Sequence, residues 1–218
     1  KDILKDYISD MTETDSCKVD ILCKINNKDE LINVVKYANE NKIPIVPCVA
    51  RTNLGGLCIP SSGGIILDLS GMNKIISVDA GTMTAIIEPG VTFQQIHDYL
   101  DVNYKNLAFG YPLSPPTSSV LCNCVLDGLS NLSLKYGSMA EWITGMEVML
   151  ADGSLLKTGS SAVSEYWFGK LPLCDLGGIF VSSQATLGIV TKIGVTLWPK
   201  PKYRKRFFIL AYELNKSM

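Results

Sequence analysis

The stretch IPIVPCVARTNLGG, Ile43 to Gly56, decides how the chain folds. Its first part, Ile43 to Pro47, is too short and too β-branched for a helix and is bounded by prolines, which predicts a buried strand. Directly before it, apolar residues recur at helical spacing from Leu31 to Ala38, behind acidic residues in the first turn, where the helix dipole favours negative charge. A helix followed at once by a buried strand is typical of α/β packing.

The second part of this stretch, Ala50 to Gly56, combines small residues with Asn53 behind Arg51. Such residues tolerate the left-handed backbone that lets successive amides converge on an anion, phosphate above all. Neither GxGxxG nor GxxxxGK[ST] occurs, so neither a Rossmann dinucleotide site nor a P-loop is supported. The residues alone leave two alternatives, a phosphate-binding loop or an ordinary strand–turn–strand connection.

Short apolar runs separated by turn residues follow this stretch. Ile65–Leu69, Ile75–Asp79 and Thr84–Glu88 predict a β-meander. Thr92 is the expected N-cap of a short helix that carries His97, the single histidine of the chain, which we expect at the helix surface or edge.

The rest of the chain alternates between a loop and strands. Four prolines and glycines between Phe109 and Ser119 predict a long, stiff loop, and such loops are often functional. Ile143–Leu150 and Ser154–Thr158 predict a hairpin about an Asp-Gly turn. The segment Gly177–Pro201 predicts further strand, broken at Gly188.

Composition places the chain among folded proteins with a substantial core. Of its 218 residues, 47% are hydrophobic, and 20 basic and 21 acidic residues nearly cancel, which argues against nucleic acid or an anionic membrane as a partner. No apolar run approaches the roughly 18 residues that span a bilayer. Seven cysteines form no CxxC pair, so we expect reduced, mostly buried thiols, no metal site and a cytoplasmic location. We interpret Cys122 and Cys124 as small core residues.

Five segments occur in order along the chain: NENKIPIVPCVARTNLGG, GGIILDLSGMNKIISVDAGTMTAIIEPGVT, PPTSSVLCNCVLDG, LKYGSMAEWITGMEVMLADG and GIFVSSQATLGIVTKIGVTLWPKP. Together they resemble the FAD-binding domain of the p-cresol methylhydroxylase type, found in vanillyl alcohol oxidase and in glycolate and D-lactate oxidoreductases. The likeness runs from about Lys24 to Lys202, and five elements in register are more specific than any one of them.

The resemblance implies an α+β fold in which two subdomains hold an extended FAD. It implies an N-terminal α/β subdomain at 1–60, a second subdomain at 61–205 and, from 206 to 218, the start of a linker to a substrate domain that the chain lacks. Backbone amides of the loop after the strand would wrap the pyrophosphate; the residues of this loop are Pro47, Val49, Ala50, Arg51, Thr52, Asn53, Leu54 and Gly55. A second group would lie along the diphosphate, ribityl chain and isoalloxazine, namely Pro116, Ser118, Ser119, Cys122, Asn123 and Leu126. Ile143 and Gly145 would approach the adenine half, and Ile189 and Val190 would close over the flavin.

The chain departs from the family pattern at two places. The family usually has glycine where this chain has Ala50, and often Gly-Gly-Asn where it has Leu121-Cys122-Asn123. No histidine or cysteine occupies the places where relatives tether flavin within this domain, which predicts non-covalent FAD. No side chain here is assigned as a catalytic acid or base.

The resemblance implies a flavin-dependent oxidoreductase that oxidises a small alcohol, 2-hydroxy acid or phenol by hydride transfer to flavin N5. Its substrate would be bound with the help of a cap domain or partner subunit. An FAD-holding electron relay or non-catalytic module that docks to a partner is the main alternative. An apo structural domain, with the loop at Arg51 disordered or filled by side chains, is a third.

Overall fold

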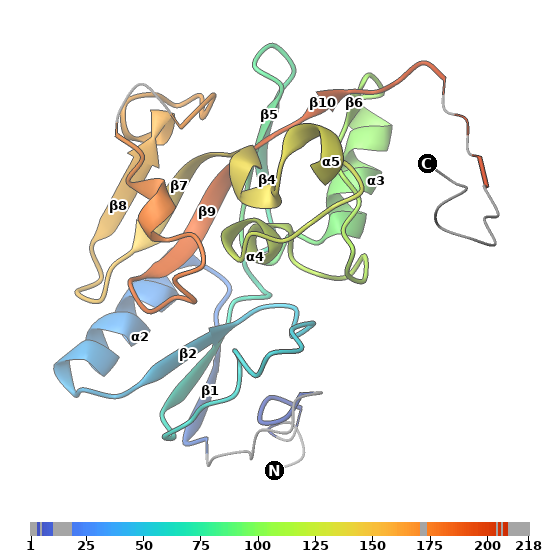
Figure 1. The fold of residues 1–218 in the computed structure, drawn as a ribbon. Helices are drawn as coiled ribbons and strands as arrows, with labels where there is room; N and C mark the ends of the chain where they lie inside the picture. The colour runs from blue at the N-terminus through green and yellow to red at the C-terminus, as the bar shows by residue number, and fades with distance from the viewer. Residues whose placement is uncertain are drawn as a thin grey trace.

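The computed structural model describes residues 4, 6–10, 19–170, 174–203, 205 and 207–208. Within them the chain forms a three-stranded sheet, a five-stranded sheet and a two-stranded ribbon of β6 (Leu107–Ala108) and β10 (Trp198–Pro199), with helices between and beside them (Figure 1). This mixture confirms the α+β prediction. Cys17 and most of the expected 206–218 linker lie outside the described residues. None of the helices in the described ranges is long and apolar enough to cross a membrane.

The three-stranded sheet is parallel, with the order β1 (Ile21–Lys24), β3 (Ile65–Asp68), β2 (Ile45–Cys48). The helix α2 (Lys28–Glu40) precedes β2, as the sequence predicts, and buries Leu31, Val35 and Ala38. The strand starts two residues later than predicted, because the Ile43 amide still donates to the Ala38 carbonyl at the end of the helix, at 2.8 Å.

The predicted three-strand meander is wrong in its first strand. β3 does not pair with β4 (Ile75–Asp79) but lies between β1 and β2, with all four of its residues buried. Burial on both faces is characteristic of the middle of a parallel sheet, and a short apolar run carries no sign of which sheet it joins. Of the three strands predicted to form the meander, β4 and β5 (Thr84–Ile87) are the two that pair with each other. Because β3 follows residue 60, we propose that the subdomain division lies after Asp68.

The five-stranded sheet is antiparallel, in the order β4, β5, β9 (Ile189–Thr196), β7 (Ile143–Met149) and β8 (Leu155–Gly159). The predicted hairpin is confirmed as β7 (Ile143–Met149) and β8 (Leu155–Gly159). Its turn is closed by Asp152, whose Oδ1 accepts from the Ser154 amide at 2.8 Å, and Gly153 takes the left-handed conformation, with φ 78°. Two 3-10 helices, η1 (Met139–Trp142) and η2 (Ser160–Ala162), flank the hairpin.

The segment before β9 (Ile189–Thr196) is not strand, contrary to the prediction. It forms the 3-10 helix η3 (Gly177–Ile179) and then a series of turns up to Gly188. Left-handed backbone at Ser182, Gln184 and Ala185 excludes an extended strand there.

The helices on the antiparallel sheet are shorter than α2. The predicted helix after Thr92 is α3 (Phe93–Asn103), begun by a capping box between Thr92 and Gln95. The long loop after β6 is confirmed and leads into α4 (Val120–Val125), with α5 (Ser133–Tyr136) after it. His97 is half-buried at the edge of α3 and stacks on Tyr111, with ring centroids 4.0 Å apart, and burial lowers its pKa.

Candidate functional site

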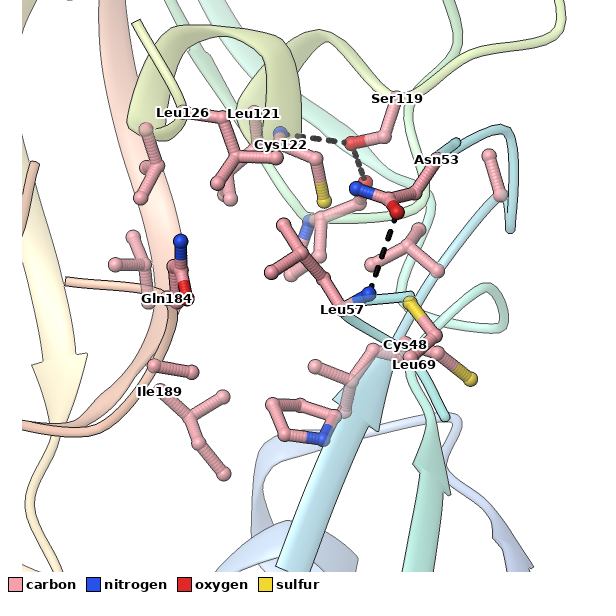
Figure 2. A pocket seen from close by; sticks show the side chains of 18 of the residues that line it. Cys48, Asn53, Leu57, Leu69, Ser119, Leu121, Cys122, Leu126, Gln184 and Ile189 are labelled. Atoms are coloured by element: carbon pink, nitrogen blue, oxygen red, sulfur yellow. Dashed lines mark hydrogen bonds between the residues drawn. The ribbon is translucent and has the colours of Figure 1, made fainter. Parts of the chain in front are cut away.

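A cavity of about 360 Å³ lies where the two main sheets meet. Its walls are β2 with the loop that follows, α4 with the residues that flank it, and the turns that lead into the start of β9 (Figure 2). The lining includes Ile45, Leu57, Leu69, Leu121, Phe180 and Ile189. Arg51 is the one charged side chain among the described residues that line it. A concave, mostly apolar site with a few polar groups is typical of small-molecule and cofactor binding.

Side-chain hydrogen bonds stabilise the conformation of the loop after β2. Asn53 Oδ1 accepts from the amides of Gly55 at 2.7 Å and of Leu57 at 3.3 Å. Arg51 takes a left-handed conformation, with φ 53°. Within the described residues, the backbone amides from 50 to 54 have no acceptor. Unpaired amides beside a cavity are the donors that a phosphate group needs, so this loop has the chemistry of an anion site.

Ser119 organises the second wall. As N-cap of α4, its Oγ accepts from the Cys122 amide at 3.0 Å and donates to the Pro89 carbonyl at 2.6 Å. The neighbouring Ser118 Oγ donates to Thr52 Oγ1 at 3.0 Å, which links this wall to the loop after β2. Figure 2 shows the Cys122 sulfur pointing from α4 into the cavity.

The cysteines near the cavity are thiols that stay protonated. Cys48, Cys58 and Cys122 all line the cavity, and burial raises the pKa of each, that of Cys58 to about 11. Cys124 lies in the core as predicted, whereas Cys122 faces the cavity because the two residues lie on different sides of α4. The thiols in the described ranges are less buried than expected, because among them only Cys48 and Cys124 are buried, and Cys174 is exposed. No cluster of potential metal ligands occurs within the described part of the chain.

Most of the residues that the resemblance implies for FAD line this cavity. They are Pro47, Val49, Ala50, Arg51, Thr52, Asn53, Ser119, Cys122, Asn123, Leu126, Ile189 and Val190. These residues come from three segments far apart in the sequence, and the fold brings them to one place.

The other implied residues lie elsewhere. Leu54 is exposed, and the Gly55 amide is bonded to Asn53. Ser118 is buried behind the wall, and Pro116 contributes its carbonyl to the Gln94 amide. Ile143 and Gly145 line a separate hollow of about 10 Å³ beside β8.

The turns before β9 form a third wall that the sequence does not identify. Figure 2 shows Gln184 and Ile189 facing the cavity opposite Asn53 and Leu57. Glutamine and alanine have no distinctive turn chemistry, and the left-handed conformations at Gln184 and Ala185 fall on residues that rarely adopt them. The run of small and polar residues at 182–186, SSQAT, is the one feature of the sequence that could have indicated turns before Gly188.

These residues fit FAD. The cofactor is long and largely apolar at both ends with a charged pyrophosphate between, so it requires aliphatic surface beside backbone donors and few charges. The cavity supplies both, with the unpaired amides of 50–53 on one side and Leu121, Leu126 and Ile189 on the other.

Comparison with known proteins identifies the domain. The glycolate oxidase subunit GlcD of Bacillus subtilis is 33% identical over 97% of this chain and 44% of its own length. The 4-cresol dehydrogenase [hydroxylating] flavoprotein subunit of Pseudomonas putida is 36% identical over 84% of this chain and 35% of its own length. A crystal structure of p-cresol methylhydroxylase with substrate bound superposes with a TM-score of 0.79 at 32% identity, over 93% of this chain and 40% of that one.

The chain spans less than half the length of each of these relatives. A family model described as "FAD binding domain" matches residues 19–159, which is more than half of the chain. The chain therefore belongs to the family of FAD-binding domains found in glycolate oxidase and p-cresol methylhydroxylase.

Proposed function

We propose that the chain is the FAD-binding part of an oxidoreductase that oxidises a small alcohol, 2-hydroxy acid or phenol. The observation that carries this proposal is the cavity, which joins unpaired loop amides to an apolar lining inside a domain of this family. Two similar proteins, named for glycolate and for cresol, support the substrate classes.

Within this site each wall has a separate task. The amides of 50–53 bind the pyrophosphate, while the Arg51 guanidinium is engaged by Tyr7 and Asp6. Ser119, Cys122, Asn123 and Leu126 lie along the middle of the cofactor, and Ile189 and Val190 shield it from water. Bound FAD supplies a hydride acceptor, and the protein supplies position and electrostatics.

The acid or base that activates substrate comes from outside the described cavity. No histidine, aspartate or glutamate occurs among the residues that line it. We propose that a substrate domain on the same polypeptide, or a partner subunit, supplies that group and covers the flavin. The apolar surface of Leu126, which lines the cavity and is 40% exposed, lies where such a cover is needed.

An absorbance spectrum of the purified chain before and after acid precipitation tests this function. We expect oxidised-flavin bands, and release of the colour into the acid supernatant, because no tether to the flavin is predicted. A colourless protein that does not take up added FAD would contradict the proposal. With the full-length protein, bleaching of the flavin by glycolate, D-lactate or 4-cresol identifies a dehydrogenase or oxidase. Reduction by a protein partner alone identifies the electron relay.

We also propose a cytoplasmic location, from cysteine usage. Free thiols persist in a reducing compartment and are oxidised outside it. Fractionation of cells that express the full-length protein tests this, and recovery in a secreted fraction would contradict it.

A further inference from the structure

The described N-terminal residues, ahead of the matched FAD-binding domain, lie against the back of the loop after β2. The Gly56 amide donates to Asp10 Oδ2 at 2.9 Å, and Arg51 Nη1 donates to the Asp6 carbonyl at 2.6 Å. Tyr7 lies between these two contacts and is 7% exposed. A segment more than 40 residues away in sequence thus contacts both ends of the loop.

The Tyr7 side chain is fixed from two sides. Its ring packs in a cluster with Cys48, the last residue of β2, and Ile66 of β3. Its hydroxyl donates to Asp68 Oδ2 at 2.6 Å, and Asp68 Oδ1 accepts from the Ser70 amide at 2.9 Å. Burial and the Asp68 carboxylate raise the pKa of Tyr7 to about 12, so the hydroxyl stays a donor at neutral pH.

The fixed ring in turn holds Arg51. The guanidinium carbon lies 4.0 Å from the Tyr7 ring centroid, within the range of a cation–π contact. Arg51 also has the left-handed backbone of the loop, a conformation that a non-glycine residue keeps only when its surroundings determine it. The two contacts of the guanidinium, to Tyr7 and to Asp6, are the surroundings that do so.

We propose that Tyr7 is a positioning residue for the pyrophosphate: by holding Arg51, it keeps the loop in the conformation that leaves the amides of 50–53 free for the cofactor. This inference rests on the proposed function and extends it to a residue outside the matched domain. It predicts that a change at Tyr7 alters the affinity for ligands that carry the diphosphate and leaves the affinity for ligands without it unchanged.

Fluorescence titrations of the 218-residue chain with FAD and with riboflavin, which lacks phosphate, test the proposal. Tyr7→Leu should weaken FAD binding about tenfold and leave riboflavin binding unchanged, because it removes the ring under Arg51. Tyr7→Phe keeps the ring and should weaken FAD binding by only about threefold. Tyr37→Leu, at a tyrosine on α2 that is 56% exposed, is the matched control and should change neither.

The double variant shows whether Tyr7 acts through Arg51. In an Arg51→Gln background, Tyr7→Leu should cause no further loss of FAD affinity. Equal FAD affinity in wild type and Tyr7→Leu, or an equal loss of FAD and riboflavin, would overturn the inference while leaving the proposed function intact. If the wild-type chain binds neither ligand, the proposed function fails and the inference fails with it.

Discussion

Ala185 carries a left-handed backbone, with φ 63°, in the turns that line the cavity. An L-residue pays roughly 1–2 kcal/mol for this conformation, whereas glycine adopts it freely. Gln184 and Ser182 share the feature, so this wall stores strain in three nearby residues. Such strain commonly collects at ligand sites, where the surroundings determine the backbone.

Replacing Ala185 with glycine is therefore expected to stabilise the protein. Ala185→Gly should raise the free energy of unfolding by about 0.5–1 kcal/mol, because relief of strain outweighs the added freedom of the unfolded chain. Urea denaturation measures this. Ala80→Gly, at an exposed turn residue without positive φ, is the control and should lower the free energy of unfolding. A change of the same sign in both variants would contradict the explanation.

The sequence locates two of the three cavity walls but not the conformation of single residues in them. The sequence predicts left-handed backbone somewhere between Ala50 and Gly56, and among the non-glycine residues there it falls on Arg51 and not on Ala50, where the family usually has glycine. Ala50 therefore fits without strain. Which residue of a loop takes positive φ depends on contacts such as those of Arg51 with Tyr7 and Asp6, which no local pattern contains.

At the scale of single elements, α4 depends on its cap. A helix of six residues gains little from its own hydrogen bonds, so side chains at its ends decide whether it forms. Ser119 satisfies the Cys122 amide and also donates to the Pro89 carbonyl, and its side chain is almost fully buried. One hydroxyl therefore fixes the start of the helix and joins it to Pro89, in the turn that follows β5.

Removing this hydroxyl should loosen the wall of the cavity. Ser119→Ala is expected to lower the free energy of unfolding by about 1–2 kcal/mol, because a cap is lost and a buried carbonyl loses its donor. Urea denaturation checks the value. Ser138→Ala is the matched control, because Ser138 precedes η1 without making a side-chain cap, and it should change stability by less than about 0.5 kcal/mol. Equal losses in both variants would exclude the capping explanation.

Elements with strong local patterns were predictable, and those set by distant contacts were not. α2, α3 and the β7–β8 hairpin follow from helical spacing, caps and an Asp-Gly turn. β3 was assigned to the wrong sheet because its partners, β1 and β2, precede it by some 20 to 40 residues. Sheet membership is a non-local property, and four buried residues in a row carry no information about it.

At the scale of the whole molecule, the two main sheets share part of their core. Met149 of β7 and Ile189 of β9 pack in one cluster with Leu31 of α2 and Leu67 of β3. The antiparallel sheet thus inserts side chains into the α2 side of the parallel sheet, next to the cavity. A cofactor site at such a junction keeps its shape only while both sheets are in place.

Met149→Ala should therefore weaken both parts of the molecule together. A buried Met→Ala change costs about 2–4 kcal/mol, and we expect a single urea transition with one shifted midpoint. Trp142, Trp167 and Trp198 report on the antiparallel part by fluorescence, and circular dichroism reports on the whole chain. Leu134→Ala, at a fully exposed side chain, is the control. Separate midpoints for the two signals would show that the sheets unfold independently.

The position of β3 between β1 and β2 also fixes the order of events during synthesis. A nascent chain that ends before Ile65 contains both outer strands and α2, but neither of the hydrogen-bonded pairs of the finished sheet. Tyr7 likewise has to wait for Asp68 to be added before its hydroxyl finds an acceptor. The edges of β1 and β2 that pair with β3 thus remain without a partner strand on the ribosome until residues 65–68 have emerged. Unpaired strand edges can pair with other chains, so the nascent chain is prone to aggregation and depends on chaperones during this interval.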